Sequence, residues 1–164
     1  MSDRAQQLAD QLQQANEDVI AFVEAASAET WGKWCPGEQC TVAALASHIG
    51  DGCGGILDSL VLPVAEGRPG PVFTPDDLHR GNAAAAQANA IRPKAEVLAV
   101  LREQGQRAVS CVRELTDEQL QRTEQLPFSP EPISAEAVIE HVLIGHPRGH
   151  LASLQTAVYQ TVHP

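Results

Sequence analysis

The chain has 164 residues, a formal net charge of -10, 43% hydrophobic residues and only 4% aromatic residues. This length fits one domain, so we expect a single domain over residues 1–164. An acidic chain without a visible basic face argues against nucleic acid and anionic membrane surfaces as partners. With so few aromatic residues, the core must consist mostly of Ala, Leu, Val and Ile, which favours close helix packing over a sheet.

The sequence also indicates a compartment. The N-terminal stretch MSDRAQQLADQLQQ is polar and lacks the apolar core of a secretory signal. No apolar run approaches the roughly 20 residues that a membrane helix needs. The cysteines form no C-x-x-C pair, which argues against a zinc ribbon or a thioredoxin-type motif. We therefore expect a cytoplasmic protein whose thiols are free, at Cys35, Cys40, Cys53 and Cys111.

Apolar spacing predicts two helices in the first part of the chain. The first should begin near Asp3, with Gln6 in capping-box position. The stretch Thr30–Cys40 is predicted to be a loop. A second helix should have Thr41 as its N-cap and continue through Gly50–Gly55, where it either frays or packs unusually close to a neighbour. The two apolar seams are Leu8, Leu12, Ala15, Val19, Phe22, Val23 and Ala26, and then Ala44 or Leu45, His48, Ile49, Gly52, Ile56 and Leu60.

A long connection should follow the second helix, from Pro63 to Phe73. Thr74-Pro75-Asp76-Asp77 then has the pattern of an N-cap, a proline at the first helical position and an acid at the third, which predicts a helix from Pro75 to about Ala90. Arg92-Pro93 ends that pattern. The next helix has the seam Leu98, Leu101, Ala108, Val112 and Leu115.

The C-terminal part begins with a short helix, for which Thr116 and Gln119 form a capping box. A loop is predicted over Gln125–Pro132. Ser134 should cap a last helix that runs to about Val162. Strand signals are weak throughout, so the pattern predicts an all-α four-helix bundle with long crossovers.

Two of the six histidines have the spacing of a metal site. His146 and His150 are four residues apart, so on a helix their Cβ atoms would lie about 5–6 Å from each other on one face. That face also carries apolar residues, which points it into the bundle. His48 lies on the inner seam of its own helix and could supply a third imidazole. Three protein ligands with one open position are typical of catalytic zinc, although imidazole also suits Ni, Fe and Cu.

Other interpretations of the histidines remain open. An inward-facing histidine is often a hydrogen-bonded core residue without a metal. Pro147 lies between the two helical histidines, and a proline inside a helix removes a hydrogen bond and kinks the chain. His79 and His163 are expected to be solvated, and His141 is expected to lie outside the ligand set. A di-iron site is discounted because no Glu stands three residues before His141, His146 or His150.

Three short motifs resemble the DinB-like superfamily, in the branch related to the N-terminal domain of mycothiol-dependent maleylpyruvate isomerases. These are WCPGEQCTVAALASHIGDG (Trp34–Gly52), DLHRGNAAAAQ (Asp77–Gln87) and GHPRGHLASL (Gly145–Leu154). The resemblance implies an up-down-down-up four-helix bundle with an extra short helix in the crossover. It also implies a divalent metal, for which we expect zinc or nickel, held by His48, His146 and His150.

The resemblance implies a cofactor as well, because characterised members use a low-molecular-weight thiol such as mycothiol, bacillithiol or glutathione. Two departures matter. Leu151-Ala152 follows the last histidine where many members have Arg-Gly, and the additional C-terminal domain of the isomerase has no counterpart in this sequence. The resemblance therefore implies an S-transferase or isomerase type of reaction rather than one named reaction.

Further residues are candidates around such a site. Asp51 could orient a ligand imidazole or a bound water, or be a solvated carboxylate. Arg80, Asn82 and Arg148 could bind carboxylates of a thiol cofactor or a substrate, or be ordinary surface residues. Cys53 could approach the pocket, or be a buried inert thiol.

Three functions are compatible with these features. The first is a metal-dependent thiol S-transferase or related enzyme with a small-molecule substrate. The second is a non-catalytic metal or small-ligand binding bundle. The third is a structural bundle in which the histidines only pack. A homodimer formed through outer helix faces is also possible.

Overall fold

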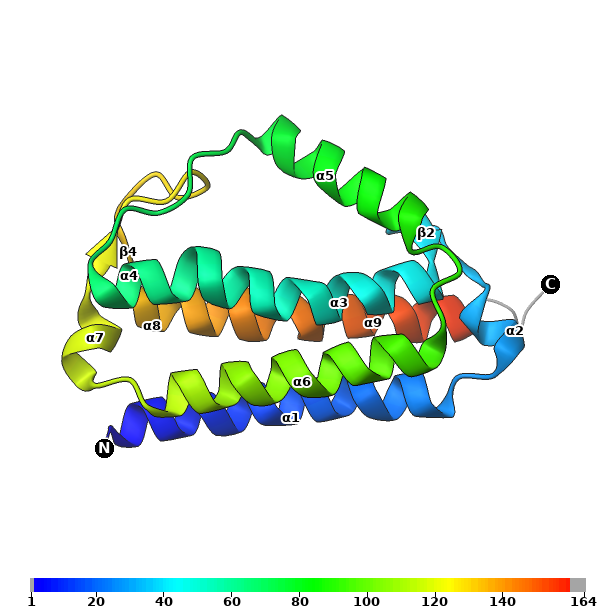
Figure 1. The fold of residues 1–164 in the computed structure, drawn as a ribbon, viewed down its shortest axis with the longest axis horizontal. Coiled ribbons are helices and arrows are strands. Elements are labelled where there is room, and N and C mark those ends of the chain that lie inside the picture. The colour runs from blue at the N-terminus through cyan, green and yellow to red at the C-terminus, as the bar shows by residue number, and fades with distance from the viewer. Residues whose placement is uncertain (1, 160–164) are drawn as a thin grey trace.

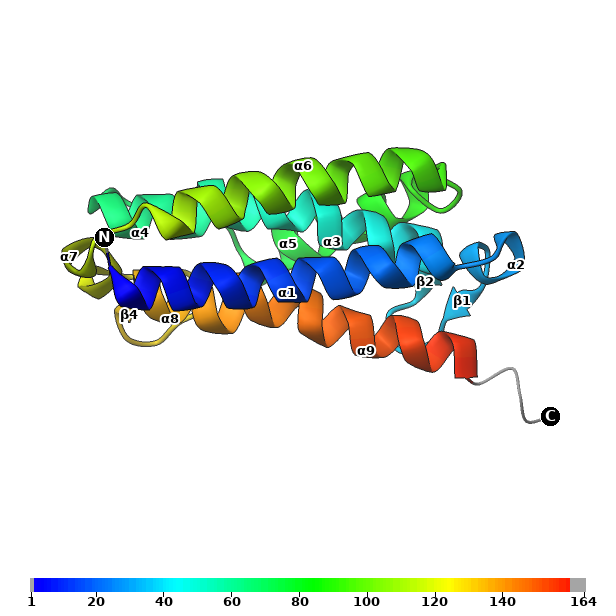
Figure 2. The same ribbon diagram turned by 90° about the horizontal axis from the view of Figure 1, so that it is seen from below.

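In a computed structural model, which describes residues 2–159, the chain forms an all-α four-helix bundle (Figures 1 and 2). The four long helices are α1 (Asp3–Ala25), α3 (Val42–Ile56), α6 (Lys94–Arg113) and α9 (Gly145–Tyr159). α1 packs against α6 and α9, while α3 packs against α6 and α9. The fold predicted from apolar spacing is confirmed.

The direction of the helices explains the long crossover. α1 and α9 run one way along the bundle, and α3 and α6 run the other way, so the up-down-down-up topology is confirmed (Figure 1). Since α3 and α6 are parallel neighbours, the chain must return along the whole bundle between them. The helix α5 (Pro75–Ala88) lies in this return segment and arches over α3, with no buried residue of its own.

Side-chain caps begin most of the helices. Thr41 caps α3, and the predicted capping boxes Thr74/Asp77 and Thr116/Gln119 start α5 and the short α7 (Asp117–Gln121). Ser134 caps α8 (Ala135–Ala137), the first turn of the last helical segment. The predicted capping box of α1 was wrong. Its N-cap is Ser2, whose hydroxyl accepts from the Ala5 amide, and the Gln6 side chain bonds Asp10 instead.

Two small hairpins close the ends of the bundle. The predicted loop Thr30–Cys40 is a more ordered segment, since α2 (Ala28–Trp31) overlaps its start and β1 (Trp34–Cys35) pairs antiparallel with β2 (Cys40–Thr41). In the same way β3 (Thr123–Glu124) and β4 (Ile133–Ser134) frame the predicted loop Gln125–Pro132. Strands of two residues carry no alternation that a sequence pattern could detect.

Two helices continue through a proline because a π-helical turn precedes it. η1 (Leu57–Val61) leads into α4 (Leu62–Glu66), which contains Pro63, and η2 (Val138–Ile144) leads into α9, which contains Pro147. A proline lacks the N–H and its ring clashes with the carbonyl four residues earlier. In both cases that earlier residue lies within the wider π turn, which displaces the carbonyl.

These two turns change the helix boundaries that we expected. The predicted connection Pro63–Phe73 was wrong at its start, because the helix continues to Glu66 and ends at Gly67, which has a φ of 66°. The last helix does not stop at Pro147, so the concern about the histidine pair is removed. The end predicted near Val162 lies outside the described residues, as does His163.

The glycine-rich part of α3 packs closely against its neighbours instead of fraying. A Cβ at Gly50 would lie 3.2 Å from Cγ1 of Val100, and one at Gly54 would overlap the Gln104 amide. The glycines at these positions let α3 approach α6 closely. This packing explains why α3 contains residues with low helix propensity. Within residues 2–159, no helix is long and apolar enough to cross a membrane.

Candidate metal centre

His48 lies on α3, seven residues after its Thr41 N-cap. The neighbours Ser47 and Ile49 are buried, while His48 itself is half-buried and faces α9. Its inward position follows from the helical period, because Ala44 and Leu45, one turn earlier on the same helix, are buried. The prediction that His48 belongs to the inner seam therefore agrees with its position.

His146 and His150 lie one turn apart on α9, which is helical without interruption from Gly145 to Tyr159. The centroids of their rings are 4.6 Å apart. The π segment η2 ends immediately before this helix and touches η1 of the facing helix. π turns in helices occur frequently at functional sites, and here one such turn sets the direction in which the two imidazoles point.

The structure brings the three imidazoles together, and we call His48, His146 and His150 the histidine triad. The His48 ring centroid lies 4.7 Å from that of His146 and 5.0 Å from that of His150. One ring nitrogen from each residue lies within 4.8 Å of the other two. Tetrahedral zinc with Zn–N bonds of about 2.0–2.1 Å would place its ligand atoms on the order of 3.4 Å apart, so the triad could hold a metal ion after a small adjustment.

Gly52 provides the space for His146. A Cβ at position 52 would lie 2.7 Å from Cε1 of His146, closer than real Cβ contacts allow. Gly52 is one turn after His48 on the same helix, so α3 carries a ligand and the gap for the opposing ligand on one face. The sequence left open whether the helix frays or packs close to a neighbour in Gly50–Gly55, and nothing in it links this segment to the histidines.

A carboxylate from the β1–β2 turn orients one imidazole of the triad. Oε1 of Glu38 lies 3.0 Å from Nδ1 of His150 and accepts a hydrogen bond from the Ser153 hydroxyl at 2.7 Å. When Nδ1–H of His150 donates to this carboxylate, Nε2 is left unprotonated for a metal. Such carboxylate–histidine pairs are the usual support of metal-binding imidazoles. Glu38 could not be predicted as a site residue, because it lies 112 residues from His150 and no local sequence pattern links the two.

Burial favours the neutral form of two imidazoles of the triad, those of His48 and His146. Desolvation, followed by the charges of His150 and His48, lowers the pKa of His146 to about 3. Desolvation and then His150 also lower the pKa of His48. Burial would raise the pKa of Glu38, but hydrogen bonds from Ser153 and His150 outweigh it, so this pKa is lowered. Neutral imidazoles beside an ionised carboxylate are the protonation states that metal binding requires.

The hydrogen bonding of the triad nitrogens also favours a metal site. Nε2 of His146 lies 2.9 Å from Nε2 of His48, so without a cation these two nitrogens must share one proton. Nδ1 of His146 is buried and has no partner among the described residues. A buried imidazole with so few hydrogen bonds is costly as an ordinary core residue. The donor set is therefore better suited to a cation than to packing alone.

A cavity of about 580 Å³ opens beside His48 and His146, beneath the arch of α5. We call it the apolar cavity. Its walls come from α3, η1, α5, η2, the start of α9 and the two loops that carry Phe73 and Phe128. This volume falls within the range of small-molecule sites, about 300–1,000 Å³. A second, more open cleft also reaches the triad, and Glu38, His141 and Gly149 line it.

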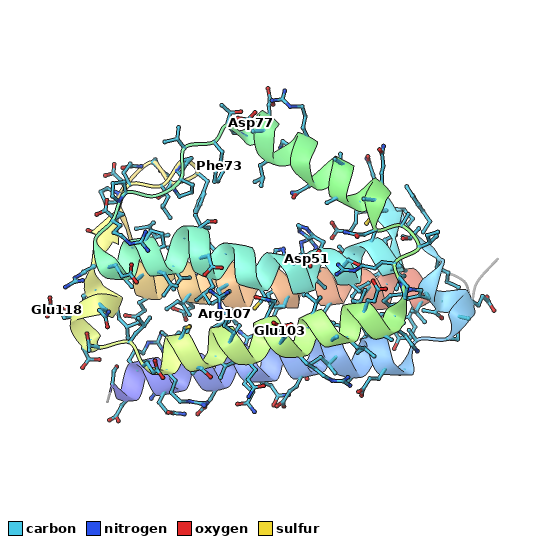
Figure 3. All side chains as sticks on the ribbon, in the orientation of Figure 1. Asp51, Phe73, Asp77, Glu103, Arg107 and Glu118 are labelled. Atoms are coloured by element: carbon cyan, nitrogen blue, oxygen red, sulfur yellow. The ribbon has the colours of Figure 1, made fainter. Side chains whose placement is uncertain are left out.

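The other predicted site residues have different positions. Asp51 and Asn82 line the apolar cavity, and Figure 3 shows Asp51 on the side of α3 that faces α5. A carboxylate oxygen of Asp51 lies 3.0 Å from a guanidinium nitrogen of Arg92, a partner that we had not considered. Arg80 is exposed and pairs with Asp77, and Arg148 is exposed; neither lines the cavity. Their roles stay predictions.

Cys53 is buried on the side of α3 that faces α6. Its Sγ lies 3.7 Å from the carbonyl oxygen of Gln104, and it does not line the apolar cavity. Burial raises the pKa of this thiol to about 11, which makes the reactive thiolate rare. Of our two alternatives, the position agrees with the buried inert thiol. His79 is exposed on α5, and His141 is exposed on η2 at the rim of the second cleft.

Comparison with known proteins identifies the family. The model of the DinB superfamily matches residues 5–154, so this chain belongs to the DinB superfamily. No curated protein matches the sequence significantly.

Two solved structures share the fold. YfiT from Bacillus subtilis, described as a probable metal-dependent hydrolase with an unusual four-helix bundle topology, has a TM-score of 0.76 at 16% identity, covering 98% of this chain and 90% of that one. An uncharacterised protein from Clostridium difficile 630 has a TM-score of 0.72 at 14% identity, covering 100% and 99%. At these identities the likeness concerns the fold.

Proposed function

We propose that this protein is a divalent-metal-dependent enzyme that uses a low-molecular-weight thiol, in an S-transferase or isomerase type of reaction. The histidine triad would hold the ion, for which we propose zinc or nickel. The observation that carries the proposal is the convergence of three imidazole nitrogens within 4.8 Å beside a cavity of about 580 Å³. Structural zinc sites usually have four protein ligands, whereas three ligands beside a cavity are typical of catalytic sites.

The chemistry divides between the ion and the protein. When bound, a divalent ion with an open coordination position deprotonates a coordinating thiol. Glu38 would keep Nε2 of His150 turned toward the site, and the apolar cavity would hold the electrophile against the thiolate while excluding water. We assign to Asp51, at the edge of the cavity and held by Arg92, the role of accepting the proton that the thiol loses.

Hydrolysis is a second candidate. The support is the likeness in fold to YfiT, which is described as a probable metal-dependent hydrolase. The same triad could serve a water nucleophile, because a metal-bound water can reach a pKa near 7. The second cleft, beside Glu38, would give water a route to the triad that does not cross the apolar cavity.

One experiment separates these candidates. The purified protein is stripped of metal, reloaded with zinc or with nickel, and supplied with mycothiol, bacillithiol or glutathione together with chlorodinitrobenzene; parallel samples receive nitrophenyl acetate without a thiol. We expect an S-conjugate that is detectable by mass spectrometry and is lost on chelation and in His150→Ala. Release of nitrophenol without thiol consumption would favour the hydrolase. Activity that survives complete metal removal would overturn both, and tight metal binding without turnover would favour a non-catalytic binding module.

A further inference from the structure

The walls of the apolar cavity are mostly hydrophobic. Six of its large side chains come from six separate segments of the fold: Ile56, Leu60, Phe73, Leu78, Phe128 and Val142. Leu78 is 49% exposed and Phe128 is 47% exposed, so their apolar surface is available to a ligand. Figure 3 shows Phe73 on the crossover that leads into α5, across the cavity from α3.

The side chains that line the apolar cavity include a carboxylate but no cationic group. Asp51 is the carboxylate that lines it, and no Lys or Arg belongs to the lining. The cations nearby have other partners, because Arg92 pairs with Asp51 and Arg80 pairs with Asp77.

Away from a metal ion at the triad, an anionic group would therefore lose its hydration in this cavity without gaining a cationic side chain as a partner. Burying an unpaired charge is costly, and the Asp51 carboxylate keeps the nearest guanidinium, that of Arg92, from pairing with an anion. An uncharged aromatic ligand meets the opposite conditions. Its rings could pack against Phe73 and Phe128, and burial of apolar surface favours binding. Ser59 and Asn82 supply a few neutral polar groups that could orient such a ligand.

We propose that the apolar cavity takes an uncharged, aromatic or otherwise bulky apolar organic molecule as substrate, with Phe73 and Phe128 as the side chains that determine specificity. The inference rests on the proposed function in one respect: the reacting atom of this molecule would face the histidine triad through His48 and His146, which line the same cavity. It also implies that carboxylated electrophiles are poor substrates.

A matched pair of fluorescent probes tests the proposal without any turnover. Phenylnaphthylamine is uncharged, and anilinonaphthalene sulfonate has the same ring system with an added sulfonate. Both are titrated into the full-length protein, metal-free and zinc-loaded, and followed by fluorescence enhancement. In the metal-free protein we expect the uncharged probe to bind at least about tenfold more tightly than the sulfonate, and Asp51→Asn to narrow this ratio by improving sulfonate binding.

Two glycine variants show where the probe binds. A Cβ at Gly55 meets nothing within 4 Å, and Gly55 lines the cavity, so Gly55→Phe should fill the space without disturbing α3. Gly81 has equally open surroundings on α5 but does not line the cavity, which makes Gly81→Phe the matched control. We expect Gly55→Phe to weaken phenylnaphthylamine binding at least about tenfold and Gly81→Phe to leave it unchanged. Phe73→Ala and Phe128→Ala should each weaken it severalfold.

The results of the probe experiments can be told apart from a failure of the proposed thiol reaction. Equal affinity for the two probes, or undiminished binding of the uncharged probe to a folded Gly55→Phe variant, would overturn the inference even if thiol conjugation is observed. Selective binding that is blocked by Gly55→Phe supports the inference even if no metal-dependent turnover is found, in which case only the proposed reaction fails. Circular dichroism and metal affinity of Gly55→Phe confirm that the fold and the triad are intact.

Discussion

Nδ1 of His150, on the last helix, lies 3.0 Å from Oε1 of Glu38, in the turn between β1 and β2. The turn is held in place partly by this contact and partly by the Ser153 hydroxyl, which donates to the same carboxylate oxygen. The two residues are 112 positions apart in the sequence. Their contact determines which nitrogen of His150 faces the other two imidazoles.

Removing the negative charge of Glu38 should weaken metal binding without removing a ligand. In Glu38→Gln the amide can still bond Ser153 but holds Nδ1–H of His150 less strongly. We expect zinc affinity to fall about 10–100-fold, measured by competition with a chromophoric chelator. Glu29→Gln is the matched control, since this side chain is 85% exposed. Equal affinity in Glu38→Gln and the wild type would show that the carboxylate does not support the site.

Removing any one imidazole of the triad should abolish stable binding of one metal ion per chain. We expect elemental analysis to find about one metal ion per chain in the reloaded wild-type protein and much less in His48→Ala, His146→Ala and His150→Ala, because two ligands rarely suffice for a protein zinc site. His79→Ala removes an exposed imidazole on α5 and should keep the metal. Retention of metal by all three triad variants would show that the site lies elsewhere.

Adding one methyl group to Gly52 should displace His146. The new Cβ would lie 2.7 Å from Cε1 of His146, so the imidazole must move and the metal affinity should fall at least about tenfold. Gly55→Ala is the natural comparison on the same helix, because its Cβ meets nothing within 4 Å. That variant should keep the metal affinity and gain up to about 1 kcal/mol of stability from helix propensity. Wild-type metal affinity in Gly52→Ala would disprove the close-packing argument.

The stability of the metal-free protein should decrease as the pH falls below about 6.5. The pKa of His146 is lowered to about 3 in the folded chain, so between these values the unfolded state binds the additional proton. Stability therefore rises with pH in this window, by at most about 1.4 kcal/mol per pH unit from this residue, and is fully present above the unfolded pKa. His48, whose pKa is also lowered, acts in the same direction.

Denaturant unfolding in the presence of a chelator, at a series of pH values, measures this effect. In a His146→Gln variant, which cannot take up the proton, the unfolding free energy should change less steeply with pH between pH 4 and pH 6 than in the wild type. This range lies inside the window between the folded pKa of about 3 and the unfolded pKa of about 6.5. The slope should not vanish, because His48 remains. Identical slopes in the two proteins would mean that His146 is accessible to protons in the folded state.

Much of the architecture follows from local sequence rules. The apolar period of three and four residues predicted the long helices, and the capping patterns Thr74/Asp77 and Thr116/Gln119 marked two helix starts that the structure contains. The spacing of His146 and His150 predicted two imidazoles on one face. These features depend on residues within a few positions of one another, so the sequence alone determines them.

Other features depend on contacts between distant segments, and only the tertiary structure decided them. The π turns that carry the helices through Pro63 and Pro147 belong to two facing segments that touch, and no local propensity predicts them. The role of Glu38 and the space left by Gly52 likewise depend on how α9 packs against the rest of the chain. Short-range rules placed His48, His146 and His150 on helix faces. The packing of α3 against α9 brought the three rings together. Contacts across a bundle depend on helix register and crossing geometry, which the spacing within one helix does not encode.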